Sequence, residues 1–377
     1  MKQKSINIII GIIVVVLIIN LVLLLAVLAP TGRVIEGESY EIGAVTPLSG
    51  KLAIYGQWQR NGMDLALEEV NKEKDFQLKI IYEDTQGDAT QAVSAAQKLI
   101  NSNKVSIIFG SLSHEVLGMA PITEENKVIL FTPGAGSEDI RQAGDYVFRN
   151  RETGIVHGSE MADLVYSLGF KKTAILYVNA PSGVSYKDGF LDRYSKIKGE
   201  IIYNEGYDKG ETDFRTDLLK IKSINPDAIY VPGYGADIGI ILKQAKELGL
   251  TVRFFSSPGI EIPELFDITG NSAEGVIYSV PVFDPSNPSV RSYAEPYKNK
   301  YGEESEFIAA NSYDAVHILA DAIESCNGDD STCIKNYLYS LRNYPGVGGK
   351  TSFDHNGDVI KPVAMKEVRS GKFEIIS

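Results

Sequence analysis

The chain has 377 residues, of which 44% are hydrophobic and 23% are charged, a composition typical of a globular protein. Its length predicts two domains once any targeting segment is set aside. The formal net charge of −12 argues against a nucleic-acid partner, because proteins that bind phosphate backbones carry basic patches.

The first 39 residues differ from the rest of the chain. Two lysines precede an uncharged, strongly apolar segment, Ile6–Ala29, which as a helix is about 36 Å long and therefore long enough to cross a membrane. The segment is longer than the apolar core of a secretory signal. A cut after the small residues at its end would place Pro30 directly after the cleavage site, which also argues against such a signal. We therefore expect residues 1–39 to be an uncleaved single-pass membrane anchor and tether, with the lysines in the cytoplasm and the rest of the chain outside. A cleaved signal is the alternative.

From Tyr40 onward, short apolar runs alternate with amphipathic stretches. The first set predicts strands near residues 40–46, 76–82, 105–109, 128–131 and 146–152, with helices near 56–71, 89–100 and 113–126 between them. Strands that alternate with helices predict a parallel sheet with right-handed crossovers. This set therefore predicts one α/β lobe.

The alternation then begins again. The second set predicts helices near residues 154–168, 184–197, 213–224, 236–248 and 262–269, and strands near 173–178, 201–203, 228–231, 253–255 and 275–280. The tail predicts three helices, near 290–301, 307–325 and 332–343, and a hairpin-like end that includes Phe353 and residues 363–375. Two sets of similar size predict two lobes, to which the tail returns without a third domain.

The two cysteines, Cys326 and Cys333, are seven residues apart between two predicted helices. Outside the cytoplasm, such a pair predicts a small structural disulfide, with two free thiols as the alternative. Neither a histidine nor a third cysteine stands nearby in the sequence, which argues against a metal site.

Enzyme motifs are incomplete wherever the sequence approaches one. Gly349-Lys350-Thr351 resembles the end of a phosphate-binding loop, but position 344 is Tyr where that loop requires Gly. The four histidines never occur at metal-ligand spacing, and no GxSxG motif is present. We therefore expect neither an enzyme nor a cofactor or metal. A hydrolase is disfavoured because a nucleophile and base pair is missing.

Open α/β sheets bind ligands beyond the carboxyl ends of their strands, where this chain has several polar loops. The first is the loop from Thr46 to Tyr55 between a predicted strand and helix. We predict that Ser49 and Tyr55 form part of a cleft wall. A structural turn without a ligand is the alternative reading of this loop.

A series of short motifs in order carries a specific resemblance. They are Thr46-Pro-Leu-Ser-Gly50, Glu83-Asp84, Gly110-Ser-Leu-Ser113, Thr132-Pro-Gly-Ala135, Phe148-Arg149, Gly233-Tyr234, Tyr313-Asp-Ala315 and Phe353-Asp354. With these motifs, the chain from Tyr40 to its end resembles the type I periplasmic binding proteins of the branched-chain amino acid and amide group, which are leucine-binding-protein-like receptors of ABC importers.

The resemblance implies two Rossmann-like lobes with parallel sheets, joined by a three-strand hinge, that clamp a ligand in the cleft between them. The crossovers would fall near Glu152, Val280 and Gly348. Lobe 1 would then contain residues 40–152 and 281–347, and lobe 2 would contain residues 153–280 and 348–377.

In the first lobe, the resemblance implies that two strand-end loops hold the ligand carboxylate through hydroxyl and backbone N–H groups. These loops are Ser111–Glu115 and Thr132–Ser137, with Ser111, Ser113, His114, Ala135, Gly136 and Ser137 as the candidate contacts. Two of these positions depart from the family pattern, because His114 stands where a serine is usual and Gly136 where a threonine is usual.

In the second lobe, the resemblance implies an aromatic contact from Tyr234 and places Ser182-Gly183 where a Tyr-Gly pair is usual. The acid that usually pairs with a ligand ammonium would fall near Pro258, and Glu261 is the nearest acid in the sequence. A buried ammonium without a carboxylate partner is costly. We therefore expect an altered ligand: an amide, a small carboxylate or an unusual amino acid.

The resemblance implies a receptor that captures a small polar metabolite (an amino acid, an amide or a small carboxylate) and delivers it to an ABC permease in the membrane. The alternative is a ligand-sensing module that acts through a membrane partner without transport.

Overall fold

The computed structural model describes residues 37–283 and 288–376. The predicted membrane anchor falls almost entirely on residues 1–36, which lie outside the described residues. Among the residues that are described, no helix combines the length and the apolar character needed to cross a membrane. From Ser39 onward the chain forms one compact unit, which contains two α/β lobes.

The sheet of lobe 1 has five parallel strands in the order β2-β1-β3-β4-β5. These strands are β1 (Ser39–Thr46), β2 (Gln77–Asp84), β3 (Ile107–Gly110), β4 (Ile129–Thr132) and β5 (Val147–Arg149). Its helices are α2 (Ala53–Glu73), α3 (Ala89–Lys98), α4 (Ser113–Glu125), α10 (Pro288–Tyr301), α11 (Phe307–Cys326) and α12 (Ser331–Ser340), with a π-helical turn at Leu99–Asn103 and a 3-10 turn at Glu138–Gln142.

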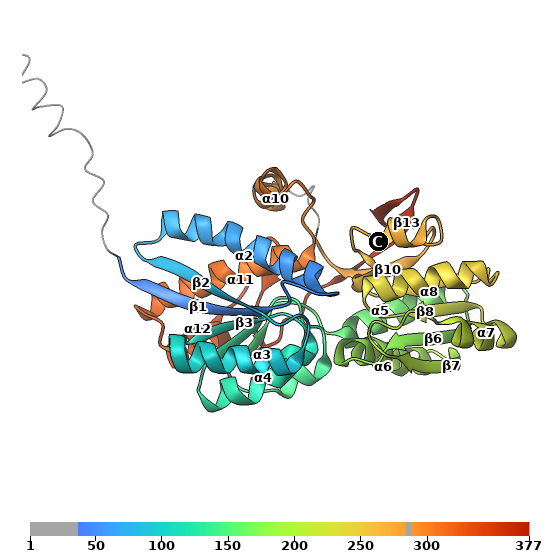
Figure 1. Ribbon diagram of the computed structural model, residues 1–377, viewed down its shortest axis with the longest axis horizontal. Coiled ribbons are helices and arrows are strands. Elements are labelled where there is room, and N and C mark those ends of the chain that lie inside the picture. The colour runs from blue at the N-terminus through green and yellow to red at the C-terminus, as the bar shows by residue number, and fades with distance from the viewer. Residues whose placement is uncertain (1–36, 284–287, 377) are drawn as a thin grey trace, which may run out of the picture. The chain divides into compact units, whose positions relative to one another are not determined.

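Both faces of this sheet are buried because apolar side chains alternate between them. On β4, Ile129 and Phe131 pack with α11 and α12, whereas Leu130 packs with α3 and α4 on the other face. Figure 1 shows α2 and α11 on one side of the sheet and α3 and α4 on the other. The predicted strand–helix alternation of the first set is therefore confirmed.

The sheet of lobe 2 has seven strands in the order β14-β13-β10-β9-β8-β6-β7. These strands are β6 (Lys172–Val178), β7 (Glu200–Tyr207), β8 (Ala228–Val231), β9 (Arg253–Ser256), β10 (Ile277–Pro281), β13 (Val363–Arg369) and β14 (Lys372–Ile375). Its helices are α5 (Gly154–Ser167), α6 (Pro181–Lys196), α7 (Arg215–Ile224), α8 (Gly235–Glu247) and α9 (Leu265–Thr269), with a 3-10 turn at Pro258–Ile260.

The first five strands of lobe 2 are parallel, and the terminal hairpin β13–β14 adds two antiparallel strands at the β10 edge. Helices α5 and α6 cover one face, and α7, α8 and α9 cover the other. The tight contact of α5 with α6 depends on glycine: a Cβ on Gly158 would lie 2.1 Å from the carbonyl oxygen of Tyr186. The predicted hairpin-like end is confirmed.

The third crossover lies later in the chain than predicted. A short hairpin, β11 (Tyr344–Gly346) with β12 (Gly349–Thr351), and the bridge between Phe353 and Val359 precede it. Phe353 packs against Phe131 and Phe148 in lobe 1, with ring centroids 5.8 and 5.4 Å apart. The chain therefore reaches lobe 2 only at β13, and the predicted crossover near Gly348 is corrected to the residues after Val359, because these aromatic contacts hold the segment on lobe 1.

Cys326 and Cys333 form a disulfide that joins the end of α11 to the first turn of α12, with Cα atoms 5.9 Å apart. The predicted disulfide is thus confirmed, and it lies within lobe 1, far along α11 from the helix start at Phe307.

Candidate functional site

The strand-end loops of the two lobes face one another across a narrow cavity of about 60 Å³. Sixteen residues line it: Tyr55, Ser111, Leu112, Ser113, Gly134, Gly136, Arg151, Ser182, Tyr186, Gly233, Tyr234, Ser257, Pro258, Gly259, Phe307 and Ile308. In lobe 1 the lining residues come from α2, from the segments that follow β3, β4 and β5, including the first residue of α4, and from the start of α11. In lobe 2 they come from α6, which follows β6, and from the segments that follow β8 and β9. The cavity is therefore where an open α/β sheet is expected to meet a ligand.

The lobe 1 wall is held together by Ser113. Its hydroxyl oxygen accepts hydrogen bonds from the N–H groups of Gly136 and Ser137, at 3.0 and 3.1 Å. The N–H of Ala135 is taken by the hydroxyl of Thr132 at 3.1 Å. Two strand-end loops that are distant in sequence are thereby joined, and these predicted anion donors are engaged by the protein itself.

The lobe 2 wall is formed where two loops pack backbone to backbone. A Cβ on Gly259 would lie 2.1 Å from the carbonyl oxygen of Gly233, so the loops after β8 and β9 can approach this closely only without a side chain. The N–H of Gly233 donates to the Ser257 hydroxyl at 3.1 Å. The loops of this wall are consequently packed closely together, and their residues in the cavity lining are neutral.

Tyr55 of α2 reaches across the cleft. Its hydroxyl accepts from the N–H of Gly235 at 3.2 Å and donates to the carbonyl of Gly259 at 3.4 Å, both in lobe 2. Its ring lies 6.0 Å from that of Tyr234 and 5.7 Å from that of Trp58. Tyr55 thus joins the two lobes in a closed arrangement, and its burial raises the pKa of its hydroxyl far above the ordinary value.

Tyr234 lies at the start of α8 and lines the cavity from lobe 2. Burial raises the pKa of Tyr234 to about 12, although a hydrogen bond with Ser182 opposes the shift. Tyr234 and Ser182 therefore stay neutral at physiological pH, and they offer the cavity two hydroxyl groups and one aromatic ring.

Arg151, just after β5, contributes the one charged side chain among the sixteen lining residues. It is only 4% exposed, and it donates to the carbonyl groups of Glu152 at 3.0 Å and Gly134 at 2.8 Å and to the Tyr186 hydroxyl at 2.9 Å. Its guanidinium carbon lies 5.1 Å from the centre of the Phe307 ring. Sequence reasoning missed Arg151. The signal that was present is a second arginine two residues after Arg149, at a strand end.

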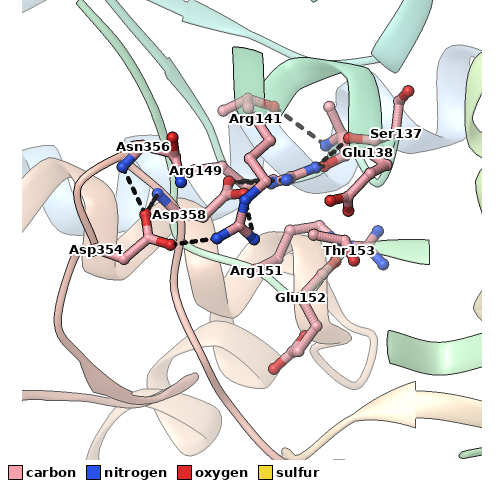
Figure 2. A network of polar contacts seen from close by, with 12 residues as sticks. Ser137, Glu138, Arg141, Arg149, Arg151, Glu152, Thr153, Asp354, Asn356 and Asp358 are labelled. Atoms are coloured by element: carbon pink, nitrogen blue, oxygen red, sulfur yellow. Dashed lines mark hydrogen bonds and ion pairs between the residues drawn. The ribbon is translucent and has the colours of Figure 1, made fainter. Parts of the chain in front are cut away.

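Arg149 has a different role. It is fully buried, and its Nε donates to Asp358 Oδ1 at 2.9 Å, while Nη1 donates to the carbonyl of Ser137. Figure 2 shows Arg149 and Arg141 converging on Asp354 and Asp358, whereas the Arg151 side chain is directed away from these aspartates. Arg149 therefore fastens β5 to the loop after β4 and to the segment before the third crossover.

Several predicted contacts lie away from the cavity. Ser49 donates to Asp84 at 2.6 Å, and the hydroxyl of Ser137 caps the short turn that follows it. The ring of His114 lies 2.9 Å, through Nε2, from the carbonyl oxygen of Gly87, and burial lowers the pKa of His114. These three residues and Ala135 do not line the cavity. Their hydrogen bonds connect loops of lobe 1 to one another or stabilise a turn within a loop.

Glu261 is not brought into the cavity. Its carboxylate accepts from the Lys366 ammonium of β13 at 2.6 Å, so it already has a cationic partner. The position near Pro258, where the sequence lacks an acid, does line the cavity. The predicted substitution of Glu261 for the missing acid therefore finds no support in the geometry, because its carboxylate is paired with Lys366 and Glu261 does not line the cavity.

Two wider cavities differ in character from the cleft cavity. One of about 600 Å³ shares Tyr55 and Tyr234 with it and contains charges of both signs, including Lys51, Lys209 and Asp237. Another, of about 680 Å³, lies at the starts of β8 and β9, the edge of the sheet opposite to the strand ends. Within the described ranges, no group of three or more His, Cys, Asp or Glu side chains could hold a metal ion.

Comparison with known proteins agrees with this geometry. A family model described as periplasmic binding protein matches residues 39–372. The crystal structure of a leucine binding protein from Thermotoga maritima is 30% identical, covers 90% of this chain and 98% of that chain, and superposes with a TM-score of 0.85. A branched-chain amino acid transporter substrate binding protein from Streptococcus pneumoniae, solved in complex with isoleucine, is 27% identical, covers 90% and 99%, and has a TM-score of 0.83. A leucine-, isoleucine-, valine-, threonine- and alanine-binding protein from Pseudomonas aeruginosa is 25% identical over 85% of this chain and 87% of its own length.

Proposed function

Because the chain belongs to the periplasmic binding protein family, with a model match over residues 39–372, we propose that it captures a small polar metabolite between its lobes and delivers it to an ABC importer. The ligand would be an amino acid, an amide or a small carboxylate. The observation that carries the proposal is the cavity at the facing strand ends, over which Tyr55 joins lobe 1 to lobe 2.

In this proposal, closure of the cleft couples capture to delivery. A ligand that contacts both walls stabilises the closed arrangement, since it adds contacts that an open form lacks. Names of relatives support the transport role: the Streptococcus pneumoniae protein is described as a transporter substrate binding protein, and the Pseudomonas aeruginosa protein as binding five amino acids. Catalysis is not part of this proposal.

We also propose that the apolar segment Ile6–Ala29 anchors the binding unit on the outer side of the cell membrane. The support for it is the sequence alone. Fractionation of cells that express the full chain, followed by alkaline extraction, tests it: a protein that stays in the membrane pellet supports an anchor, and a shortened chain in the soluble fraction contradicts it.

Thermal unfolding of the full chain tests capture. A ligand that binds only the folded protein stabilises it by RT ln(1 + [L]/Kd), about 2.7 kcal/mol at a hundredfold excess over Kd. We expect at least one compound among amino acids, amides and short carboxylates to raise the melting temperature. A screen in which every compound leaves it unchanged would speak against the proposal.

A further inference from the structure

We propose that the ligand of the cleft cavity is a small carboxylate that carries no ammonium group, and that Arg151 is its counter-charge. The inference rests on the proposed function, because it assumes that a solute binds at this site. It names the chemical class of that solute from the charges that surround it.

The first step is the charge of the wall. Of the sixteen lining residues, Arg151 alone is ionised at neutral pH, and the others are apolar, glycine, serine or tyrosine. Charge complementarity therefore calls for an anion, and the serine hydroxyls are compatible with one because a hydroxyl can donate to it.

The second step is the coordination of Arg151. A guanidinium has five N–H donors, and three are used here, all of them on neutral acceptors: two backbone carbonyl groups and the Tyr186 hydroxyl. One N–H on Nη1 and one on Nη2 have no acceptor among the described residues, and each can donate to a carboxylate oxygen. Among the described residues, no carboxylate lies within 4.0 Å of the Arg151 nitrogen atoms.

Glu152 is the acid nearest in sequence, but it does not neutralise Arg151. Its carboxylate lies 3.8 Å from Nε2 of the buried His157. Figure 2 shows the side chains of Arg151 and Glu152 pointing in different directions from neighbouring positions. Although burial opposes the shift, the pKa of Glu152 is lowered mainly by the neighbouring His157, and the charge of Arg151 adds only a smaller contribution. Glu152 is not part of the cavity lining.

The third step concerns the ammonium. A buried ammonium needs a carboxylate partner, and none lines this cavity, where the nearby Arg151 would in addition repel it. Glu261 is paired with Lys366, and Asp237 lines the wider cavity of about 600 Å³ and not the cleft cavity. An α-amino acid would therefore lose affinity relative to the same molecule without its amino group.

The fourth step is the space around the guanidinium. A Cβ on Gly136 would lie 3.4 Å from the Arg151 guanidinium carbon, so the guanidinium packs against the backbone of this loop. A larger side chain at position 136 would collide with the guanidinium. On another side, Phe307 supports the guanidinium with its ring. Ile308 and Leu112 continue the apolar wall. The body of the carboxylate is accordingly apolar or aromatic.

The experiment uses ligands that differ in one group. Leucine, 2-oxo-4-methylpentanoate, 4-methylpentanoate and 4-methylpentanamide are titrated against the full-length chain in detergent by calorimetry and thermal unfolding, with benzoate and phenylacetate as aromatic carboxylates. We expect at least one of the carboxylates without an amino group to bind at least about tenfold more tightly than leucine and the amide.

Variants then test Arg151 directly. Arg151→Met should weaken carboxylate binding by about thirtyfold or more, and Arg151→Lys should lose less because it keeps the charge. Arg215→Met is the matched control, because Arg215 is an exposed arginine of α7 that pairs with Asp213 and Glu247 at the surface. It should bind as the unchanged protein does.

The outcomes separate the two proposals. If leucine or the amide binds as tightly as the carboxylates, or if Arg151→Met changes Kd less than threefold, the anion inference is wrong while solute capture stands. If no compound in this set or in the wider screen binds, both fall. Should Arg151→Met fail to fold, the comparison of ligands on the unchanged protein still decides the matter.

Discussion

Replacement of Tyr55 by phenylalanine tests whether the cleft is held closed by the contacts described. The substitution keeps the ring against Tyr234 and removes the hydroxyl that bonds the N–H of Gly235 and the carbonyl of Gly259 in the opposite lobe. In the closed form, the buried N–H of Gly235 would then lack this partner, whereas water can satisfy both groups in an open form.

The magnitude follows from these two hydrogen bonds. At 3.2 and 3.4 Å both are long, so each contributes about 0.5–1 kcal/mol, and an unpaired buried N–H adds roughly 1 kcal/mol. The sum of about 2–3 kcal/mol corresponds to a shift of roughly thirtyfold or more from closed toward open. We expect Kd for a ligand held between the lobes to rise by at most this factor, because the observed Kd varies inversely with the closed fraction.

Distances between the lobes provide the assay. The chain has two cysteines, both in the disulfide, so spin labels attach selectively at introduced cysteines. Gln97→Cys on α3 and Lys243→Cys on α8 place labels at exposed positions, one in each lobe. Tyr55→Phe should increase the population at the longer distance.

Tyr230→Phe is the control for this assay. Tyr230 is buried in β8 of lobe 2, and its hydroxyl has no hydrogen-bond partner among the described residues. Its loss should leave the distance distribution unchanged. Equal distributions for Tyr55→Phe and the unchanged protein, or equal opening in both variants, would refute the reasoning.

Three further predictions concern lobe 1. Burial raises the pKa of Glu115 to about 7, so the folded state holds a proton that the unfolded state releases near pH 4.5, and stability should fall by roughly 3 kcal/mol as pH rises from about 4.5 to about 7. Glu115→Gln imitates the protonated form and should remove this part of the pH dependence in denaturant titrations; an unchanged profile would contradict the shift. A Cβ on Gly62 would lie 2.0 Å from a carbonyl oxygen of α11, so Gly62→Ala should lower stability by about 1–3 kcal/mol, whereas Gly118→Ala, which meets only ordinary contacts, should be neutral or stabilising. If both alanine variants melt alike, close helix packing is not the cause. Replacing Cys326 and Cys333 by serine should cost about 2–3 kcal/mol, measured as a lower denaturant midpoint, while ligand affinity, which depends on the distant cleft, should stay the same.

The alternation of strands and helices could be predicted from the sequence because it depends on local patterns. Buried strands such as Ile129–Thr132 are continuous apolar runs, and the helices carry an apolar stripe. The resemblance to the binding-protein family, together with the general position of ligands at strand ends, predicted Ser111, Ser113, Gly136 and Tyr234 as neighbours, and all four line one cavity. Their contact with a ligand stays a prediction. The short Cys326–Cys333 separation likewise allowed the disulfide to be predicted.

The tertiary structure decided what sequence spacing does not contain. Arg149 and Arg151 are two residues apart, yet Arg149 is paired with Asp358, 209 positions along the chain, while Arg151 enters the cavity. Glu261 was predicted as a site acid because it is near Pro258 in sequence, but Lys366 from the terminal hairpin takes its charge. In each case the charge that remains for a ligand depends on a partner brought close by folding, and chain position does not record that partner.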